Sequence, residues 1–455
     1  MNHLLVMVAV VLLVGCKPQN YDAGAEKDWD EIGHTPFSDI KSGIPAYDKT
    51  TVTYNRGGIP QLTISLGEPI VLGVATQEEP WGIFQFPSVY YGLDGDIIAT
   101  WSMHPDSIAS YGKEAKGYSI SKDGGESWTF HAGEELPKDS GLLLPNGDRI
   151  KIHTTEALKL EDLQLPKPVG ESHTYYPDGG SYTYLYKVSE LPDELQGVYL
   201  SRLKKGEKTW HVEHDKMNDP LAVRYSRGGL FPVVWRGNMH VAGDGSAIAG
   251  VYPGFSLNSD GTIDASGVFF YRSEDNGHSW DILSRIPYVP DLKADPFGDK
   301  RLIRGYHEPA FEILPDGSFL CVMRTSDGLD VSPIYITRSV DMGRTWSKPR
   351  PFTRNGVKPQ LVQLENGVIA LASGRPGMQL RFCTDGKGEH WTDPFEMLPY
   401  DSDEEKMTIS CGYPSLLAIG NNAFLIMYSD FKFQNQAGEL RKAIKIRRVE
   451  VSVLK

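Results

Sequence analysis

The sequence has few cysteines and no excess of basic residues, and both scarcities exclude classes of protein. Only four cysteines occur in 455 residues, and without Cys16 an odd number remains: Cys321, Cys383 and Cys411. None of them forms a CxxC pair, so we expect neither a disulfide framework nor a zinc site. We expect the three cysteines to be buried free thiols. The net charge of −13 argues against a nucleic-acid partner, because such affinity depends on Lys and Arg neutralising phosphates.

Long hydrophobic runs are also scarce. The one clear run, Leu4 to Val14, has eleven residues and is too short to span a bilayer. It is followed by Gly15-Cys16, and the whole segment resembles a bacterial lipoprotein signal peptide in which Cys16 is lipidated. An ordinary secretory signal is the alternative. We expect residues 1–15 to be the signal, residues 16–50 a tether and lead-in, and the protein to be exported and lipid-anchored at the periplasmic or outer-membrane envelope.

Several catalytic and metal-binding motifs are missing. HEPAF, from His307 to Phe311, is not a zinc-protease motif, because a proline follows Glu308 and no second histidine closes it. NSDGTI, from Asn258 to Ile263, lacks the first aspartate and the closing glutamate of a calcium loop. No G-x-S-x-G element and no phosphate-binding glycine loop occurs. We therefore expect no metal and no cofactor.

What the sequence does contain is a repeat. The pattern S-x-D-x-G-x-[ST]-W occurs strictly at residues 121–128, 273–280 and 339–346, and two looser copies end at Trp210 and Trp391. Asp and Ser can bond turn backbone, Gly supplies a permissive dihedral, and Trp packs the turn against the core. Such Asp-box turns predict a repeated β-architecture.

A second series, of hairpin-turn dipeptides between β-rich runs, interleaves with the first. These are Asp94-Gly95, Asn146-Gly147, Asp244-Gly245, Asp316-Gly317, Asn366-Gly367 and Asn421-Asn422. Proline is tolerated at a strand's first residue, and an X-Pro pair precedes five of these dipeptides. The five pairs are Phe86-Pro87, Phe231-Pro232, Glu308-Pro309, Lys358-Pro359 and Tyr413-Pro414. The spacing predicts an all-β six-bladed β-propeller over residues 51–455, with these X residues facing a shared central funnel.

The Asp boxes, blades and strand starts resemble the sialidase (neuraminidase) superfamily of glycoside hydrolases over roughly residues 75–450. HEPAFEILPDGSFLCVMR resembles the family segment with a glutamate and a substrate-binding arginine, which implies these roles for Glu308 and Arg324. CGYPSLLAIGNN resembles the segment with the tyrosine nucleophile, here Tyr413. ASGRPGMQLRF implies a second carboxylate-binding arginine, Arg375, and Asp106 falls in the acid/base region.

This resemblance implies an exo-acting, retaining glycosidase that releases a terminal, sialic-acid-like sugar from a glycan. A phenol titrates near pH 10, so a nucleophilic Tyr413 needs a base such as Glu308. An anionic nucleophile would repel a carboxylate on the anomeric carbon, which gives a physical reason for using tyrosine. Asp106 would protonate the leaving oxygen and then activate water, and His104, two residues before it, is the alternative acid/base.

One position departs from the family. Its Arg-Ile-Pro sequence is here Gln85-Phe86-Pro87, which replaces a charge by an amide and leaves a different acidic or neutral sugar as an alternative to a sialic-acid-like one. Gln85, Lys358 and His104 remain candidates for substrate binding. A polysaccharide lyase, using Tyr413 with His104 or His307, and a non-catalytic glycan-binding lipoprotein remain alternatives.

Overall fold

A computed structural model describes residues 50–56, 59–113, 116–131, 136–174, 181–300, 304–325, 332–375, 377–398 and 411–454. The expected signal peptide, Cys16 and the tether up to residue 49 lie outside the described residues. Nearly all the regular structure is antiparallel β-sheet, so the all-β prediction is confirmed. Across these ranges no helix is long and apolar enough to cross a membrane.

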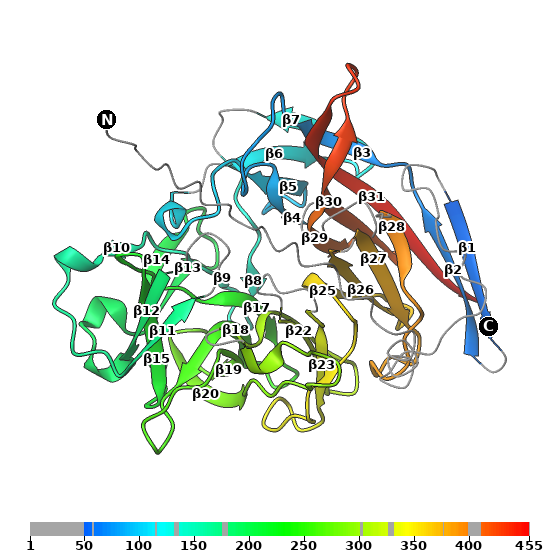
Figure 1. Ribbon diagram of the computed structural model, residues 1–455. Helices are drawn as coiled ribbons and strands as arrows, with labels where there is room; N and C mark the ends of the chain where they lie inside the picture. The colour runs from blue at the N-terminus through cyan, green and yellow to red at the C-terminus, as the bar shows by residue number, and fades with distance from the viewer. Residues whose placement is uncertain are drawn as a thin grey trace, which may run out of the picture.

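Three sheets have four strands in chain order (Figure 1). The first contains β4 (Gln85–Tyr91), β5 (Ile97–Ser102), β6 (Lys116–Ser121) and β7 (Thr129–His131). The second contains β21 (His307–Ile313), β22 (Phe319–Arg324), β23 (Tyr335–Ser339) and β24 (Arg350–Pro351). The third contains β25 (Val357–Gln363), β26 (Ile369–Gly374), β27 (Met378–Cys383) and β28 (Phe395–Leu398).

A fourth sheet joins the two ends of the described chain. Its strands are β1 (Thr50–Arg56), β2 (Ile59–Leu66), β3 (Ile70–Val74), β29 (Cys411–Ala418), β30 (Ala423–Gln434) and β31 (Leu440–Leu454). Both β2 and β3 pair with β31, so the N-terminal strands complete a sheet begun by the last three. Figure 1 shows the sheets arranged around a common centre, with β4, β25 and β29 near it.

The remaining strands form one merged sheet, because β14 and β20 pair in parallel at an outer edge. Its first group is β8 (Leu142–Leu143), β9 (Arg149–Ile152), β13 (Val198–Leu203) and β14 (His211–Asn218). Its second group is β17 (Arg236–Val241), β18 (Ala247–Ser256), β19 (Gly267–Ser273) and β20 (Ser279–Ile286). An excursion adds β10 (Leu158–Lys159), β11 (Gly170–Thr174), β12 (Ser181–Lys187), β15 (Ala222–Arg227) and β16 (Leu230–Phe231). Short 3-10 helices are η1 (Ile108–Ser110), η2 (Leu160–Asp162), η3 (Val188–Glu190), η4 (Asp193–Leu195) and η5 (Gly298–Lys300).

The turn predictions are confirmed. Each of the six dipeptides lies between two strands that pair antiparallel: β4–β5, β8–β9, β17–β18, β21–β22, β25–β26 and β29–β30. The interpretation of Phe231-Pro232 is wrong. Phe231 ends the short β16 and is fully buried in an apolar cluster, where its ring packs 5.8 Å from that of Tyr186, so Pro232 opens no central strand.

The Asp boxes have the bonding that their residue types predict. In the first, the Ser121 hydroxyl and the backbone N–H of Ser127 both donate to Asp123, at 2.8 and 2.9 Å. Gly125 N–H donates to Ser121 Oγ, and the Trp128 indole donates to the Gly125 carbonyl at 3.2 Å. The box at residues 273–280 repeats this pattern bond for bond. These turns fix the outer strands so that the Trp side chains pack inward.

Apolar side chains fill the space between neighbouring sheets. Between β21–β24 and β25–β28, for example, Leu320, Ile336, Leu371 and Trp391 form a buried cluster. Truncating such a tryptophan to alanine lowers the free energy of unfolding by about 3–5 kcal/mol. Cys321, Cys383 and Cys411 are buried and form no disulfide, which confirms that prediction.

Candidate active site

Four central strands share a local distortion where they start. The pairings of β4, β21, β25 and β29 each shift register across an X-Pro pair. At three of these pairs the residue before proline has positive φ, near +50°: Phe86, Glu308 and Lys358. A bulge re-aims a side chain, and positive φ in a non-glycine residue costs about 1–3 kcal/mol, so the surrounding sheets must hold it in place.

The bulged residues line one cavity of about 910 Å³ at the centre of the ring. Phe86, Glu308, Lys358 and Tyr413 all contribute to its wall, as the X-Pro argument predicts. The size falls in the range of sites that enclose a small molecule. The cavity is therefore the candidate active site.

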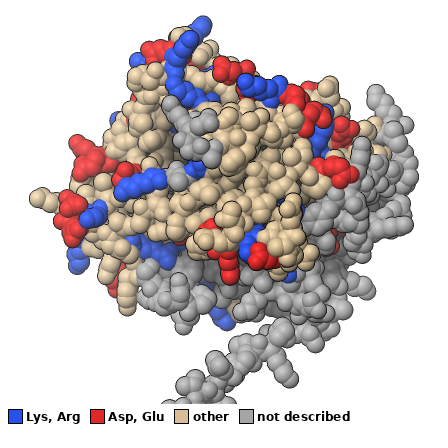
Figure 2. Space-filling view, turned by 90° about the horizontal axis from the view of Figure 1, so that it is seen from above, with Lys and Arg blue, Asp and Glu red and all other residues tan. Residues whose placement is uncertain are grey.

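Positive charge is concentrated inside the cavity. Its described lining residues include seven cationic side chains and two acidic ones, although the whole chain carries −13. The cations are Lys116, Arg227, Arg236, Arg304, Arg324, Lys358 and Arg375. On the outer face in Figure 2, acidic and basic side chains are interspersed. The excess of cations is thus a property of the cavity, and it favours an anionic ligand.

Tyr413, Glu308 and Arg324 form a connected group at the cavity wall. Arg324 Nη1 donates to Glu308 Oε2 at 2.9 Å and to the Tyr413 hydroxyl at 2.6 Å. The backbone N–H of Lys358 donates to the same Glu308 oxygen at 3.2 Å. Glu308 is 6% exposed, so this carboxylate depends on these donors in place of water.

Ionisation in this group is opposed by burial and governed by the neighbouring charges. Burial would raise the pKa of Glu308, but Arg324 and Lys358 hold it well below its usual range, so the carboxylate is ionised at neutral pH. Burial raises the pKa of Tyr413 to about 12, with Arg324 pulling it down and Glu308 pushing it up through its charge and a hydrogen bond. The pair is therefore a phenol beside a carboxylate that can accept its proton.

Arg375 completes the surroundings of Tyr413. Its guanidinium carbon lies 5.2 Å from the centroid of the Tyr413 ring and 4.9 Å from that of Trp81. It is 6% exposed, and its Nε and Nη2 have no hydrogen-bond partner among the described residues. A buried guanidinium with unused donors is suited to binding a carboxylate.

Asp106 and His104 lie on the loop between β5 and β6 and line the same cavity. The Trp81 indole donates to Asp106 Oδ2 at 3.2 Å, and Asp106 N–H donates to the Trp81 carbonyl at 3.3 Å. His104 Nδ1 lies 2.9 Å from the carbonyl of Pro105. Trp81 is 41% exposed and forms the rim between Asp106 and Arg375.

Gly82 controls the position of this loop. It has φ +105°, and a Cβ there would lie 2.2 Å from the backbone nitrogen of Asp106. We expect Gly82→Ala to displace Asp106 and lower kcat about 100-fold, because misplacing a catalytic group by about 1 Å has that effect. Gly95→Ala is the matched control, since Gly95 also has positive φ but nothing within 4 Å of its Cβ. Steady-state kinetics measures both variants, and their melting temperatures show whether each is folded. Equal losses of kcat in the two folded variants would contradict a positioning role for Gly82.

The prediction that Gln85 binds substrate is not supported, because its side chain does not face the cavity. Its side chain is 1% exposed, it is absent from the cavity lining, and neither amide atom has a hydrogen-bond partner among the described residues. The bulge turns Phe86 inward instead, and its ring lies 5.2 Å from that of Tyr413. The residue that replaces the family's arginine is thus packed behind the wall.

An apolar residue should therefore be tolerated at position 85. We expect Gln85→Met to raise the free energy of unfolding by about 1–3 kcal/mol, since it removes an unsatisfied buried amide, and to leave KM unchanged. Gln196→Met is the control, because that amide donates to the Leu191 carbonyl at 2.6 Å and its loss should destabilise. Urea unfolding measures both. A tenfold change in KM for Gln85→Met would contradict this and would show that Gln85 takes part in substrate binding.

Comparison with known proteins identifies the family. A family model described as a BNR repeat-like domain matches residues 167–426, more than half of the chain. The chain belongs to this family. The matched region includes the Asp boxes at residues 273–280 and 339–346 as well as Glu308, Arg324, Arg375 and Tyr413. No curated protein matches the chain.

Solved structures similar to this BNR repeat-like protein have low sequence identity. A protein of unknown function from Dyadobacter fermentans is 18% identical, with a TM-score of 0.53 over 86% of this chain and 99% of that chain, which shows a shared fold. The Hadza microbial sialidase Hz136 is 15% identical, with a TM-score of 0.42 over 81% of this chain and 65% of that chain. An alpha-L-arabinanase of Penicillium chrysogenum is 16% identical, with a TM-score of 0.44 over 83% and 98%.

Sequence reasoning missed part of the cavity of this BNR repeat-like protein. Arg236 and Tyr252 face each other across β17 and β18, and both line the cavity with Arg304 and Tyr111. An X-Pro pair is the local signal that marks the start of the other central strands, and β17 begins without one. The Asp244-Gly245 turn was sufficient to locate β17 but not to identify its first residue as part of the site.

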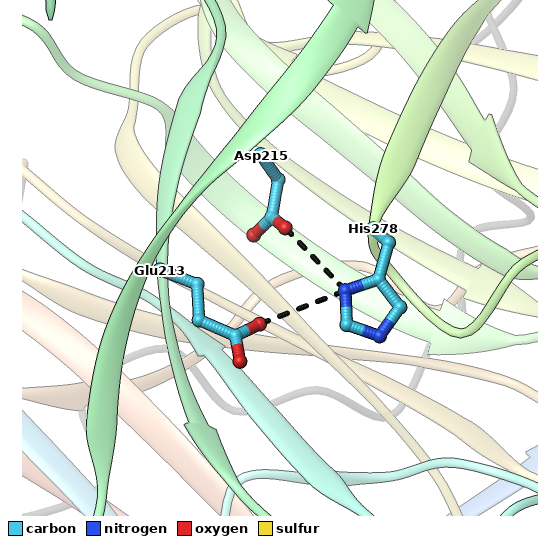
Figure 3. A group of neighbouring side chains, drawn as sticks. All are labelled: Glu213, Asp215 and His278. Carbon is cyan, nitrogen blue, oxygen red and sulfur yellow. Dashed lines mark ion pairs between the residues drawn. The ribbon is translucent and has the colours of Figure 1, made fainter.

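A second group of titratable side chains lies outside the cavity, where β14 and β20 pair (Figure 3). His278 Nδ1 is 3.7 Å from both Glu213 Oε2 and Asp215 Oδ1. The fully buried Arg202 donates from Nε to the same Glu213 oxygen at 2.6 Å. This arginine occupies the position from which a cation would bind Glu213, so the group is an ion-pair network between strands.

Within this network Asp215 should make stability depend on pH. Burial and Glu213 raise its pKa from 3.8 to about 6, against Arg202 and His278. Because this pKa lies above the usual 3.8, protonation of Asp215 stabilises the folded state. This contribution is complete below pH 3.8 and is lost as the pH rises through about 6. We expect Asp215→Asn to match the parent in urea unfolding near pH 4 and to be more stable at pH 7.

Asp123→Asn is the opposite control for this experiment. Bonds from Ser127 and Ser121 lower the pKa of Asp123 to about 2, so its ionised form stabilises the fold at neutral pH. That variant should lose stability at pH 7. An Asp215→Asn protein less stable than the parent at pH 7 would contradict the assignment for Asp215.

Proposed function

We propose that the cavity is the active site of an exo-acting, retaining glycoside hydrolase of sialidase type, which releases a terminal acidic sugar from a glycan. The observation that carries the proposal is the contact group of Tyr413, Glu308 and Arg324 in a cavity rich in cations. It combines a nucleophile with a proton acceptor and a cation, in a site suited to an anion.

In the first step the Tyr413 oxygen bonds to the anomeric carbon while its proton passes to Glu308. Asp106 donates its proton to the glycosidic oxygen, so the bond to the leaving group breaks with that oxygen neutral. Arg324 and Arg375 lie beside the Tyr413 ring and stabilise negative charge on the phenolic oxygen as it develops.

In the second step Asp106 removes a proton from water, whose oxygen attacks the anomeric carbon. The bond to Tyr413 breaks, and the phenolate recovers its proton from Glu308. Two displacements at one carbon retain the configuration. All groups needed are side chains of this chain, and the balance requires only water.

The substrate's carboxylate is assigned to Arg324 and Arg375, with Lys358 nearby. Arg375 supports this because its buried Nε and Nη2 have no hydrogen-bond partner among the residues that the structure describes. With Gln85 behind the wall, two arginines remain where the resemblance implies three, so the bound acid need not be sialic acid itself. One charge-assisted hydrogen bond is worth about 1.5–3 kcal/mol, enough to change which acidic sugar is preferred.

We further infer a six-bladed grouping of the sheets. The support is that each of six turn dipeptides joins a central hairpin, and that the merged sheet contains two runs of four strands, β8-β9-β13-β14 and β17-β18-β19-β20. With the other four sheets this gives six radial units.

We also propose that residues 1–15 are a lipoprotein signal and that Cys16 carries a lipid anchor to the cell envelope. Failure of Cys16→Ser to release the protein from membranes would contradict the anchor.

A panel of aryl glycosides tests the enzymatic proposal. It pairs acidic sugars with neutral sugars of the same ring size, in both anomeric forms. We expect release of the aryl group from an acidic member with retained configuration, detected by NMR of the first product. No release from any member would reject the hydrolase.

The same panel separates the two alternatives. A lyase would generate a product with ultraviolet absorption from its new double bond. Burial lowers the pKa of His307 to about 3, so its imidazole is uncharged near pH 7, which counts against a lyase that needs His307 as a cationic proton donor. A glycan-binding protein would bind an acidic sugar without turnover.

A further inference from the structure

Arg236 lies in the cavity but has no part in the proposed reaction. It begins β17, and its guanidinium carbon is 4.3 Å from the centroid of the Tyr111 ring. It also hydrogen-bonds the hydroxyl of Tyr252, its cross-strand neighbour on β18. Tyr111, Tyr225 and Tyr252 line this part of the cavity. An arginine among phenol rings can receive both an anion and the sugar that carries it.

No acidic side chain of the described residues forms an ion pair with Arg236. Two arginines outside the cavity do have such partners: Arg202 pairs with Glu213, and Arg272 pairs with Asp244 and Glu274. The charge of Arg236 is therefore not neutralised by the part of the protein that the structure describes. A cation turned into a cavity without a counter-charge is an expected feature of an anion site.

The neighbouring charges increase this need for an anion. Burial lowers the pKa of Lys358 most, and the charges of Arg236 and Arg324 lower it further, against the opposing charge of Glu308. The cations thus extend from the Tyr413 group to Arg236, and Glu308 accepts hydrogen bonds from Arg324 and from the backbone N–H of Lys358 but forms no ion pair with Arg236. A ligand with one acidic group would neutralise one end of this row and leave the other.

The chain around Arg236 holds it in place. Trp235 packs edge-on against the buried Trp280, with ring centroids 5.4 Å apart. Gly237 has φ +156°, and a Cβ there would lie within 1.9 Å of the Gly250 carbonyl oxygen, so only glycine lets β17 approach β18 this closely. The site is fixed by sheet packing before any ligand binds.

Tyr111 indicates which part of the substrate reaches Arg236. It follows Asp106 on the same loop, and Asp106 acts on the leaving oxygen in the proposed reaction. We propose that Arg236, with Tyr111 and Tyr252, forms a second anion subsite that binds an acidic group on the sugar next to the one released. The preferred substrate is then a glycan with two adjacent acidic sugars. This inference rests on the proposed function and specifies its substrate class.

Three matched substrates test it. All release the same acidic sugar, and they differ only in the next sugar, which is neutral, a uronate or sulfated. We expect the parent to favour the two acidic forms over the neutral one by about 10- to 100-fold in kcat/KM, the effect of one charge-assisted hydrogen bond. The uronate and sulfate arms distinguish which anion the subsite prefers.

Arg236→Gln should abolish this preference, and Arg236→Lys should restore part of it. Arg272→Gln is the control, because Arg272 lies on β19 outside the cavity lining and should keep the parent's ratio. If Arg236→Gln does not fold, the rise in parent melting temperature with non-hydrolysable forms of the same disaccharides provides the second measurement, and the acidic forms should raise it more.

The failures are distinguishable. A parent that cleaves all three substrates equally, or an Arg236→Gln variant with the parent's ratio, overturns the subsite while the hydrolase stands. A parent that cleaves none rejects the hydrolase. In that case equal thermal shifts with neutral and acidic disaccharides would reject the subsite as well.

Discussion

Tyr413→Phe should lower kcat roughly a thousandfold or more while changing KM by only a few-fold. The variant loses the attacking oxygen but keeps the ring that packs against Phe86 and the two arginines. Removing a covalent nucleophile commonly costs several orders of magnitude in kcat, because the remaining groups cannot form the intermediate. Steady-state kinetics on the best aryl glycoside from the panel measures it.

Tyr199→Phe is the matched control for that variant. Tyr199 is a stacked tyrosine that donates to the Glu194 carbonyl outside the cavity lining, so its loss should leave kcat at the parent value. A Tyr413→Phe protein with more than a tenth of the parent's kcat would contradict the assignment of Tyr413 as nucleophile.

Arg324→Met should have the second largest effect, on stability and activity together. It removes the cation that Glu308 and Tyr413 share, and it leaves the buried Glu308 with uncharged donors, the backbone N–H of Lys358 and the Tyr413 hydroxyl. Breaking a buried pair by removing one partner costs about 3–5 kcal/mol. We expect that loss in urea unfolding at pH 7, with at least a hundredfold loss in kcat/KM.

The pH dependence has a definite sign. Because the folded-state pKa of Glu308 lies below its usual 4.5, its ionised form stabilises the parent above pH 4.5, and this contribution is lost as the pH falls. In Arg324→Met the destabilisation should therefore shrink on acidification. A double variant with Glu308→Gln should be less destabilised than Arg324→Met alone, since no buried charge is left unpaired. A double variant whose loss is the sum of two large single losses would contradict the pairing.

Much of the fold could be predicted because its signals are local. Each Asp box is one turn whose own side chains satisfy it, as Ser121, Asp123 and Trp128 do. Asp-Gly and Asn-Gly pairs mark hairpins by their dihedral requirements. The prediction for Phe231-Pro232 is wrong because an X-Pro pair looks the same in a central strand and in an excursion, and only tertiary packing distinguishes the two.

The site was partly predictable for a related reason. Glu308, Lys358 and Tyr413 precede prolines at strand starts, and the structure brings all three to one cavity. The direction of Gln85 depends on a bulge that exchanges the inward residue for its neighbour, which the alternation of a regular strand cannot reveal. Arg236 has no local marker, since its role depends on Tyr111 from a distant loop.

Trapping of the covalent intermediate tests the central claim most directly. An acidic sugar with fluorine beside the anomeric carbon and a good leaving group forms the glycosyl-enzyme but releases it slowly, since fluorine destabilises the positive charge of both transition states. Mass spectrometry of the intact protein and its peptides then locates the sugar. We expect one sugar per chain on the peptide containing Tyr413, and none in Tyr413→Phe. An adduct on another residue, or no adduct in a protein that hydrolyses the unfluorinated sugar, would contradict the account.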